Sequence, residues 1–197
     1  MTKRLFDFVF SLLGILIFSP IFIIIALTIK LDSKGSVFYR GLRVGKQGRS
    51  FRIYKFRTMV FNAEEIGGPS TASDDPRLTK ISNFLKKYQL DELPQFINVI
   101  KGEMSFVGPR PEVKRYIDML SEEEKKLVLS IRPGMTDFAS LWNFHEGEIL
   151  KGSPDPEKTY IEKIRPKKIE LQLKYVKEKN FWLDIKLIFK TIVKIFQ

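Results

Sequence analysis

A long, almost uncharged apolar run near the start of the chain restricts its fold more than any other feature. Between Leu5 and Ile29 the sequence reads LFDFVFSLLGILIFSPIFIIIALTI, and Asp7 is its only charged residue. As a helix this run would be about 37 Å long, whereas the hydrocarbon core of a bilayer is about 30 Å thick. The run therefore predicts a helix within a membrane. A cleaved signal peptide is disfavoured, because the run is long and no small-x-small cleavage site follows it.

A serine–proline pair interrupts the run near its middle. Proline removes one helical hydrogen bond, and a neighbouring serine hydroxyl can bind the freed carbonyl, so Ser19-Pro20 predicts a break in the membrane helix. Cations flank the run on both sides, and the positive-inside rule would place both flanks in the cytoplasm. A re-entrant helix, which enters and leaves by the same face, satisfies this rule, but charge alone leaves a plain span equally open. The flanking cations are Lys3, Arg4, Lys30, Lys34, Arg40 and Arg43.

The net charge of +11 is concentrated at the two ends of the chain. Residues 1–60 carry 11 Lys/Arg against 2 acidic residues, residues 61–157 carry 12 against 17, and residues 158–197 carry 11 against 4. Because the basic N-terminal part contains the apolar run, we expect it to bind a lipid bilayer and no nucleic acid. The chain has no cysteine and one histidine, His145, so disulfides, thiolate metal sites and sites built from several histidines are excluded.

The remaining segments predict a small hairpin followed mostly by helices. Two β-rich runs flank the turn sequence GKQGR within residues 37–59, and GGPSTASDD at 67–75 is typical of a loop. We therefore predict an α+β, mainly helical fold: an N-terminal re-entrant membrane helix, a small β-hairpin, and a compact helical catalytic domain with interfacial amphipathic helices. Helices are expected at 78–88, at 92–101, at 122–131 behind a Ser121/Glu124 capping box, and from 157 onward with a break at Pro166. The expected parts are 1–34, 35–180 and 181–197.

The last segment, FWLDIKLIFKTIVKIFQ at 181–197, predicts an amphipathic helix. Lys186, Lys190 and Lys194 recur every four residues and form one cationic stripe, while aromatic and aliphatic residues cover most of the remainder. A wide apolar arc with a lysine stripe is typical of a helix that lies in the membrane interface. A helix that packs in the core is the alternative.

Two adjacent carboxylates, Asp91 and Glu92, precede Pro94 at the expected start of the helix 92–101. A purely structural interpretation makes Asp91 the N-cap and Glu92 a first-turn acid. Chemistry is favoured by the neighbouring cations and by Gly108-Pro109-Arg110-Pro111, in which prolines restrict the backbone on both sides of one arginine. An arginine whose position is restricted in this way is suited to bind a phosphate group. The positive end of the helix would also keep Asp91 ionised at neutral pH.

Several motifs together are similar to one protein family over almost the whole chain. They are KRLFDF near the start, the Ser19-Pro20 break, KFRTM at 55–59, DPRLT at 75–79, LDELPQFINVIKGEMSFVGPRPE at 90–112 and RPGMT at 132–136. On these residues the chain resembles the bacterial sugar transferases, also called monotopic phosphoglycosyl transferases or polyprenyl-phosphate phosphosugar transferases. The sequence departs from the common pattern at Lys86, Gln89, Asp137 and Ser140, where arginine, serine, glycine and glutamine are frequent.

The resemblance implies a protein of the bacterial inner (plasma) membrane, with its catalytic domain on the cytoplasmic face. Such proteins transfer a phosphosugar from a UDP-sugar to polyprenol (undecaprenyl) phosphate and release UMP, which is the first membrane step of bacterial glycan synthesis. The resemblance implies that Asp91 is the nucleophile of a covalent aspartyl-phosphosugar, that Glu92 with Asp91 forms a Mg²⁺ site, and that Arg110 holds phosphate. Magnesium and cations would offset the repulsion between a carboxylate and a diphosphate.

Four further cations are candidate ligands for the nucleotide-sugar phosphates. Lys55 and Arg57 follow the hairpin turn, and Lys86 lies shortly before the carboxylate pair. Arg77 follows the loop at 67–75, which is a weaker candidate for a mobile lid.

A different class of function also accounts for the layout of charge. In this alternative, the chain is a non-catalytic membrane-anchored adaptor whose basic ends hold an acidic middle for a protein partner. It leaves Asp91-Glu92 and Gly-Pro-Arg-Pro without a purpose. The sequence assigns no role to His145, and a homo-oligomer is possible only through membrane contacts.

Overall fold

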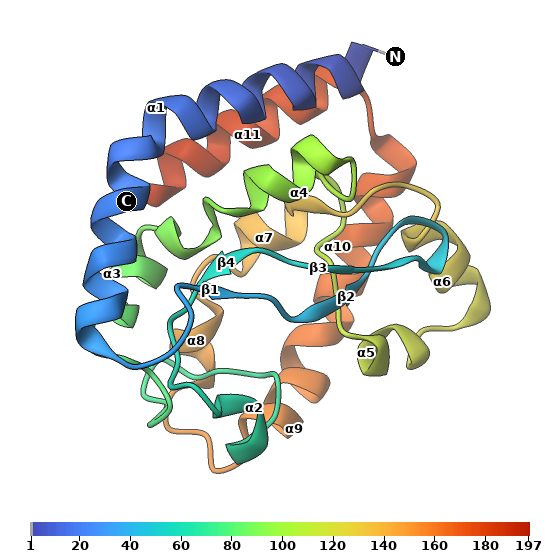
Figure 1. The fold of residues 1–197 in the computed structure, drawn as a ribbon. Helices are drawn as coiled ribbons and strands as arrows, with labels where there is room; N and C mark the ends of the chain where they lie inside the picture. Colours follow the sequence, from blue (N-terminus) through green and yellow to red (C-terminus); the bar gives the residue numbers. More distant parts are fainter. Residues whose placement is uncertain (1) are drawn as a thin grey trace.

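The N-terminal apolar run forms one bent helix, α1 (Thr2–Asp32), in a computed structural model that describes residues 2–197. Figure 1 shows its first half running beside the C-terminal helix α11 (Phe181–Ile195) and its second half turning down past α3 (Ser82–Lys87). The predicted break is thus a bend within a continuous helix. Pro20 cannot donate to the Leu16 carbonyl, and the Ser19 hydroxyl donates to that carbonyl instead, at 2.8 Å.

The side of α1 that faces the protein is polar at its start, and most of its apolar side chains face outward. Asp7 and Ser11 are buried, and the Asp7 carboxylate accepts a hydrogen bond from the Phe106 amide at 3.2 Å. Only 17% of the most apolar 18-residue stretch of α1 is buried, and Leu31 is 89% exposed. A core helix of a soluble protein buries its apolar face, and α1 shows the opposite pattern, which is the one expected of a helix that faces lipid.

Both ends of α1 are fastened to the same body of the protein. At the start, Lys3 donates to the Val107 carbonyl at 3.0 Å, and Arg4 donates to the Ile100 carbonyl at 2.7 Å. At the other end, the Arg57 guanidinium donates to the Ser33 carbonyl at 2.8 Å. The helix therefore lies across one face of the molecule from end to end.

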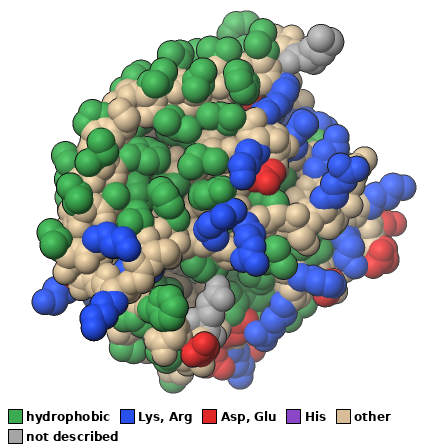
Figure 2. Space-filling model, viewed as in Figure 1, with side chains coloured by type: hydrophobic (Ala, Val, Ile, Leu, Met, Phe, Trp, Pro, Cys, Tyr) green, Lys and Arg blue, Asp and Glu red, His purple; other side chains and the backbone are tan. Residues whose placement is uncertain are grey.

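The predicted hairpin is confirmed. The strands β2 (Leu42–Val44) and β3 (Ser50–Arg52) pair antiparallel across the 3-10 turn η1 (Lys46–Gly48). Beyond them, β1 (Phe38–Tyr39) pairs with β4 (Lys55–Phe56). Figure 2, viewed as Figure 1, shows Lys and Arg side chains gathered near the middle of the molecule and hydrophobic side chains along α1.

The remaining chain is mainly helical, as predicted, with differences at the helix ends. The expected helix 78–88 is the shorter α3, and the expected helix 122–131 ends at Val128. The Ser121/Glu124 capping box is present. These elements are α2 (Ala63–Ile66), α4 (Gln95–Lys101), α5 (Lys114–Asp118), α6 (Glu122–Val128), α7 (Phe138–Trp142), α8 (Glu146–Leu150), α9 (Pro156–Thr159), the π-helix η3 (Tyr160–Ile164) and α10 (Arg165–Glu178), with Pro166 in the first turn of α10.

The structure contains a short parallel strand pair that the sequence did not predict. The strand β5 (Ser105–Val107) pairs with β6 (Gly134–Thr136), which brings two of the sequence motifs side by side. Gly134 allows this approach, because a Cβ atom there would lie 2.1 Å from the Gly108 nitrogen. Val107 then packs against Tyr175 and Leu187 in the core between β5, α10 and α11.

Candidate active site

The two adjacent carboxylates lie on a tight turn between α3 and α4. Gln89 adopts a left-handed conformation (φ 53°), and the chain then forms the 3-10 turn η2 (Leu90–Glu92). The helix α4 begins at Gln95 and not at the predicted Glu92, and its N-cap position is Pro94. The N-cap positions of η2 and α4 are Gln89 and Pro94, so the interpretation of Asp91 as the N-cap is wrong. The turn instead presents two carboxylates that are both more than 90% buried.

Glu92 is held by two cations that the sequence had placed among the candidate site residues. The Arg110 guanidinium binds both of its carboxylate oxygens, with Nη1 at 2.6 Å from Oε2. Lys55 Nζ donates to Oε1 at 2.7 Å. Burial opposes ionisation of Glu92, but Arg110 and Lys55 outweigh it and hold the pKa of this carboxyl below its usual range.

The paired strands β5 and β6 determine where Arg110 points. The Gly108 amide donates to the Thr136 carbonyl at 3.0 Å, and the Gly134 amide donates to the Pro109 carbonyl at 3.0 Å. Arg110 follows directly, and its Nη1 donates to the Met135 carbonyl at 2.5 Å. The Gly-Pro-Arg-Pro and Arg-Pro-Gly-Met-Thr motifs therefore form one unit that aims the guanidinium at Glu92.

Asp91 differs from Glu92 in both its partners and its electrostatics. None of the described residues donates a hydrogen bond to the Asp91 carboxylate. Burial raises its pKa to about 6, while Lys55 and Lys86 oppose the rise and Glu92 adds to it. Burial, and not the end of a helix, therefore dominates the pKa of Asp91. Because about 6 still lies below neutral pH, Asp91 is mostly ionised there and is an unpaired anion among cations.

These groups line one large cleft, of about 890 Å³. Asp91, Glu92, Arg110, Lys55 and Lys86 all contribute to its wall. Burial lowers the pKa of the Lys86 ammonium, with the nearby charge of Asp91 acting in the opposite direction. The cleft thus joins an unpaired carboxylate to a set of cations, an arrangement that suits an anionic substrate.

Two of the predicted phosphate ligands, Arg57 and Arg77, lie outside the cleft. Arg57 is buried against the end of α1, where it binds the carbonyls of Ser33 and Lys34. Arg77 pairs with the Asp75 carboxylate at 2.7 Å and also donates to the Gly68 carbonyl at 3.1 Å, so it holds the loop at 67–75 in shape. Neither residue lines the cleft. Arginines that satisfy main-chain carbonyls have a structural use, which explains both placements.

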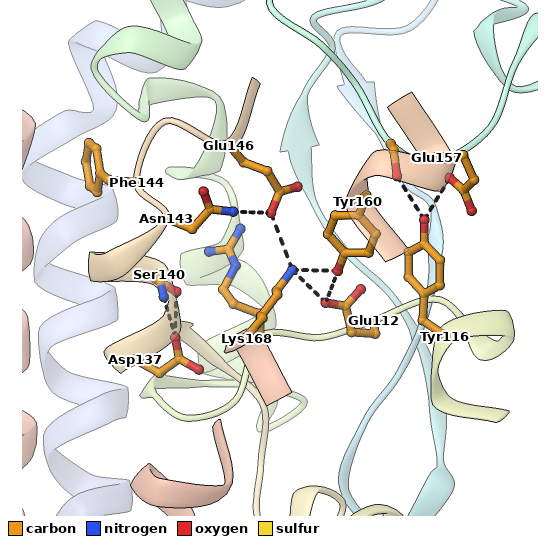
Figure 3. A network of polar contacts seen from close by, with 12 residues as sticks. Glu112, Tyr116, Asp137, Ser140, Asn143, Phe144, Glu146, Glu157, Tyr160 and Lys168 are labelled. Atoms are coloured by element: carbon orange, nitrogen blue, oxygen red, sulfur yellow. Dashed lines mark hydrogen bonds and ion pairs between the residues drawn. The ribbon is translucent and has the colours of Figure 1, made fainter. Parts of the chain in front are cut away.

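The cleft also contains residues that the sequence had left without a role. Ser140 lines it from α7, Asn143 from the turn after α7 and Glu146 from the start of α8, and Lys168 of α10 lines it as well (Figure 3). Because α7 ends at Trp142 and α8 begins at Glu146, no single helical periodicity in the sequence could have placed them on one face. His145 lines the cleft as well.

A magnesium ion is compatible with the chemistry of this site. No group of three or more His, Cys, Asp or Glu side chains suited to a metal occurs among the described residues. Mg²⁺ needs only one or two protein carboxylates when substrate phosphates and water complete its shell. Asp91 is unpaired and could supply one ligand, whereas Glu92 could do so only by exchanging contacts with Arg110 or Lys55.

Comparison with known proteins identifies the family. The family model described as bacterial sugar transferase matches residues 1–197. The chain belongs to this family. The bacterial sugar transferase is 38% identical over 193 residues to the UDP-N-acetylgalactosamine-undecaprenyl-phosphate N-acetylgalactosaminephosphotransferase of Aeromonas hydrophila, a match that covers 96% of this chain and 42% of the relative.

Other relatives have similar identity. The UDP-glucose:undecaprenyl-phosphate glucose-1-phosphate transferase of Escherichia coli (strain K12) is 37% identical over 98% of this chain and 39% of the relative. The exopolysaccharide production protein ExoY of Rhizobium meliloti (strain 1021) is 34% identical over 98% of this chain and 84% of the relative. The chain thus spans about two fifths of the length of the first two relatives. Their names differ in the sugar and share the UDP donor and the undecaprenyl phosphate acceptor.

Proposed function

We propose that this bacterial sugar transferase moves a phosphosugar from a UDP-sugar to undecaprenyl phosphate, a polyprenol phosphate, and releases UMP. The observation that carries the proposal is the unpaired, buried Asp91 carboxylate in a large cleft lined by cations. The names of the relatives support the donor and the acceptor. These names also disfavour a non-catalytic adaptor. An adaptor would in addition have no use for the buried, unpaired charge of Asp91.

In the first step, an oxygen of Asp91 attacks the phosphorus that carries the sugar. A bond forms between this oxygen and phosphorus, the bridging P–O bond of the diphosphate breaks, and UMP leaves with the bridging oxygen. In the second step, a phosphate oxygen of the polyprenol phosphate attacks the same phosphorus and displaces Asp91. The product is a polyprenol-diphosphate sugar. The covalent intermediate lets a water-soluble donor and a lipid acceptor use one site in turn.

The cations of the cleft offset the charge of the incoming diphosphate. Lys86 is half-buried in the wall that also carries Asp91, and none of the described carboxylates forms an ion pair with it, so it is available to bind a donor phosphate. Arg110 and Lys55 are paired with Glu92, which leaves their positive charge available only in part. We propose that a donor phosphate shares or takes over these contacts when it enters, because phosphate matches the arginine fork as well as a carboxylate does.

Asp91 and Glu92 are also the proposed ligands for Mg²⁺. The ion would supply positive charge to the diphosphate that Asp91 attacks. Glu92 is well suited to keep a negative charge for such a cation, because its pKa is held low by Arg110 and Lys55.

We further propose that α1 is re-entrant, with the catalytic part on the cytoplasmic face of the bacterial inner membrane. A helix that crossed about 30 Å of hydrocarbon would place its two ends on opposite sides of the membrane. The contacts of Arg4 with Ile100 and of Arg57 with Ser33 tie both ends to one body. The bend at Pro20 and the outward apolar side chains support the same arrangement. The exposed aromatic residues of α11 support a second contact with the interface, since Trp182 and Phe196 are each 79% exposed.

The test is to incubate the membrane-embedded protein with UDP-sugar and Mg²⁺ alone and to measure its intact mass. We expect the wild type to gain the mass of one phosphosugar, and Asp91→Asn to gain none. UMP release from UDP-glucose and UDP-N-acetylgalactosamine in the presence of undecaprenyl phosphate identifies the donor. Near wild-type turnover by Asp91→Asn would show that another group is the nucleophile.

A further inference from the structure

One wall of the cleft carries hydrogen-bond acceptors that the proposed phosphoryl chemistry does not use. Ser140, Asn143 and Glu146 recur at intervals of three residues and all face the cleft. Figure 3 shows Asn143 and Glu146 meeting Lys168 at one end of a network that continues to Glu112 and Tyr160. This wall of the cleft therefore consists of polar side chains that a network of hydrogen bonds and ion pairs holds in place.

The network leaves one oxygen of Glu146 and one of Asn143 without a partner among the described residues. Asn143 Nδ2 donates to Glu146 Oε2 at 2.8 Å, and Lys168 Nζ lies 3.7 Å from the same oxygen. Lys168 is held in turn by Glu112 Oε1 at 2.8 Å and by the Tyr160 hydroxyl oxygen at 3.0 Å. Glu146 Oε1 thus has no partner among the described residues. Asn143 Oδ1 also has none, although this side chain is more than 90% buried.

A buried acceptor without a partner needs a donor from water or from a ligand. The charges on this wall indicate which ligand it suits. Lys168, Glu112 and Glu146 together carry one negative charge, so this wall repels phosphate, whereas Lys55, Lys86 and Arg110 attract it at the other part of the cleft. Carboxylate and amide oxygens accept hydrogen bonds from hydroxyl groups. The cleft therefore has a basic part at Lys55, Lys86 and Arg110, and a part at Asn143 and Glu146 whose free acceptors suit hydroxyl groups.

We propose that Glu146 and Asn143 bind the hydroxyl groups of a sugar ring in the nucleotide-sugar donor, and that Lys168 is a positioning residue that fixes Glu146. This inference rests on the proposed function, since it assigns a subsite for the same donor. The ring is either the transferred hexose or the ribose, which share this chemistry, and the experiment separates the two.

The experiment measures equilibrium binding of UDP-glucose, UDP-N-acetylgalactosamine and UMP to full-length Asp91→Asn protein in nanodiscs with Mg²⁺, where no turnover occurs. Adding Glu146→Gln is expected to weaken UDP-sugar binding about tenfold, the usual effect of losing a hydrogen bond to a charged group. Glu148→Gln is the matched control, because Glu148 is exposed on the same helix and lines the same cleft without an ion pair. It is expected to change binding less than twofold.

UMP contains the ribose but no hexose, so it identifies the ring. Unchanged UMP binding by Glu146→Gln assigns the wall to the hexose, and a parallel loss assigns it to the ribose. Asn143→Ala should act in the same direction. Lys168→Met should weaken donor binding, and Lys168→Arg should restore most of it.

Two results would overturn the inference: UDP-sugar binding by Glu146→Gln within twofold of its parent, or an equal loss in Glu148→Gln. A melting temperature for each variant identifies any that fail to fold, and Asn143→Ala then decides. Failure of the proposed function looks different, because the wild type would then release no UMP and the Asp91→Asn protein would bind no UDP-sugar.

Discussion

At the scale of single residues, two adjacent carboxylates have opposite electrostatic roles. Asp91 is buried, none of the described residues donates a hydrogen bond to its carboxylate, and burial raises its pKa to about 6. Glu92 is paired with Arg110 and Lys55, and its pKa falls. A buried charge that lacks partners costs more folding free energy than a buried charge that is ion-paired and hydrogen-bonded. The pair therefore combines an unpaired anion with an ion-paired one.

This contrast predicts stability changes of opposite sign. Asp91→Asn should stabilise the fold at neutral pH, on the order of 2 kcal/mol, because it removes a buried charge. The folded pKa of Asp91 is raised above the unfolded value, so the cost of its charge is present above about pH 6. The gain from Asp91→Asn should shrink as the pH falls from about 6 to about 4.

Glu92→Gln is the matched comparison. It should destabilise the fold by about 3 kcal/mol at neutral pH, because Arg110 and Lys55 lose their carboxylate partner. The folded pKa of Glu92 is lowered, so this loss should fade only as the pH falls below the ordinary value. Denaturant unfolding of both variants at pH 7.5 and pH 4 checks the signs. Destabilisation by Asp91→Asn at pH 7.5 would contradict the assignment of an unpaired charge.

At the scale of elements, the sequence predicts most helices and the hairpin because their signals are local. The capping box of Ser121 with Glu124 and the turn around GKQGR each lie within a few residues, and both are present. The pairing of β5 with β6 is not local, since Ser105 lies opposite Gly134, and short parallel strands leave no periodic pattern. The same limit explains why Arg57 and Arg77 were expected in the cleft: their carbonyl partners become visible only in the fold.

Gly134→Ala tests whether this strand pair positions the site. A Cβ atom at residue 134 would lie 2.1 Å from the Gly108 nitrogen, so the two strands would have to separate. We expect a loss of about 3 kcal/mol in stability and a large loss of UMP release, since Arg110 follows the displaced strand. Gly68→Ala is the control, because its Cβ would meet only the flexible Glu157 side chain, at 3.3 Å. Equal melting temperatures for the two variants would show that the pairing tolerates the change.

The helix α11 combines core and surface contacts, which the sequence had offered as alternatives. Leu187 and Asp184 are buried, whereas Trp182, Phe189 and Phe196 are exposed beside the lysine stripe. Replacing Lys186, Lys190 and Lys194 with glutamate should weaken binding to vesicles containing anionic lipid by roughly 1 kcal/mol for each lost cation. Binding to neutral vesicles is the control and should change much less. An unchanged affinity for anionic vesicles would mean that α11 does not face the lipid headgroups.

At the scale of the whole molecule, α1 lies across one face of the protein body, and we propose that it joins this body to the membrane. Its apolar side chains face outward, and its polar residues and both of its ends face the body. The turn that carries Asp91 lies close to α1 in space, because α4, which follows this turn in the chain, packs against α1. Such proximity suits an enzyme whose acceptor arrives through the bilayer.

The topology of α1 gives the most direct test of this arrangement. Cysteines introduced at Thr2 and Ser36 in living cells should both be shielded from an impermeant thiol reagent added from the periplasmic side, because a re-entrant helix keeps both ends in the cytoplasm. The chain has no cysteine of its own, so all labelling reports these two positions. Both should be labelled after the cells are permeabilised, which controls for burial of the thiols. Pro20→Ala should shift part of the population toward a span, since it restores the backbone donor to the Leu16 carbonyl. Labelling of position 2 alone in intact wild-type cells would show a plain span, and the contacts of Lys3 and Arg4 with the body could not then form in the membrane.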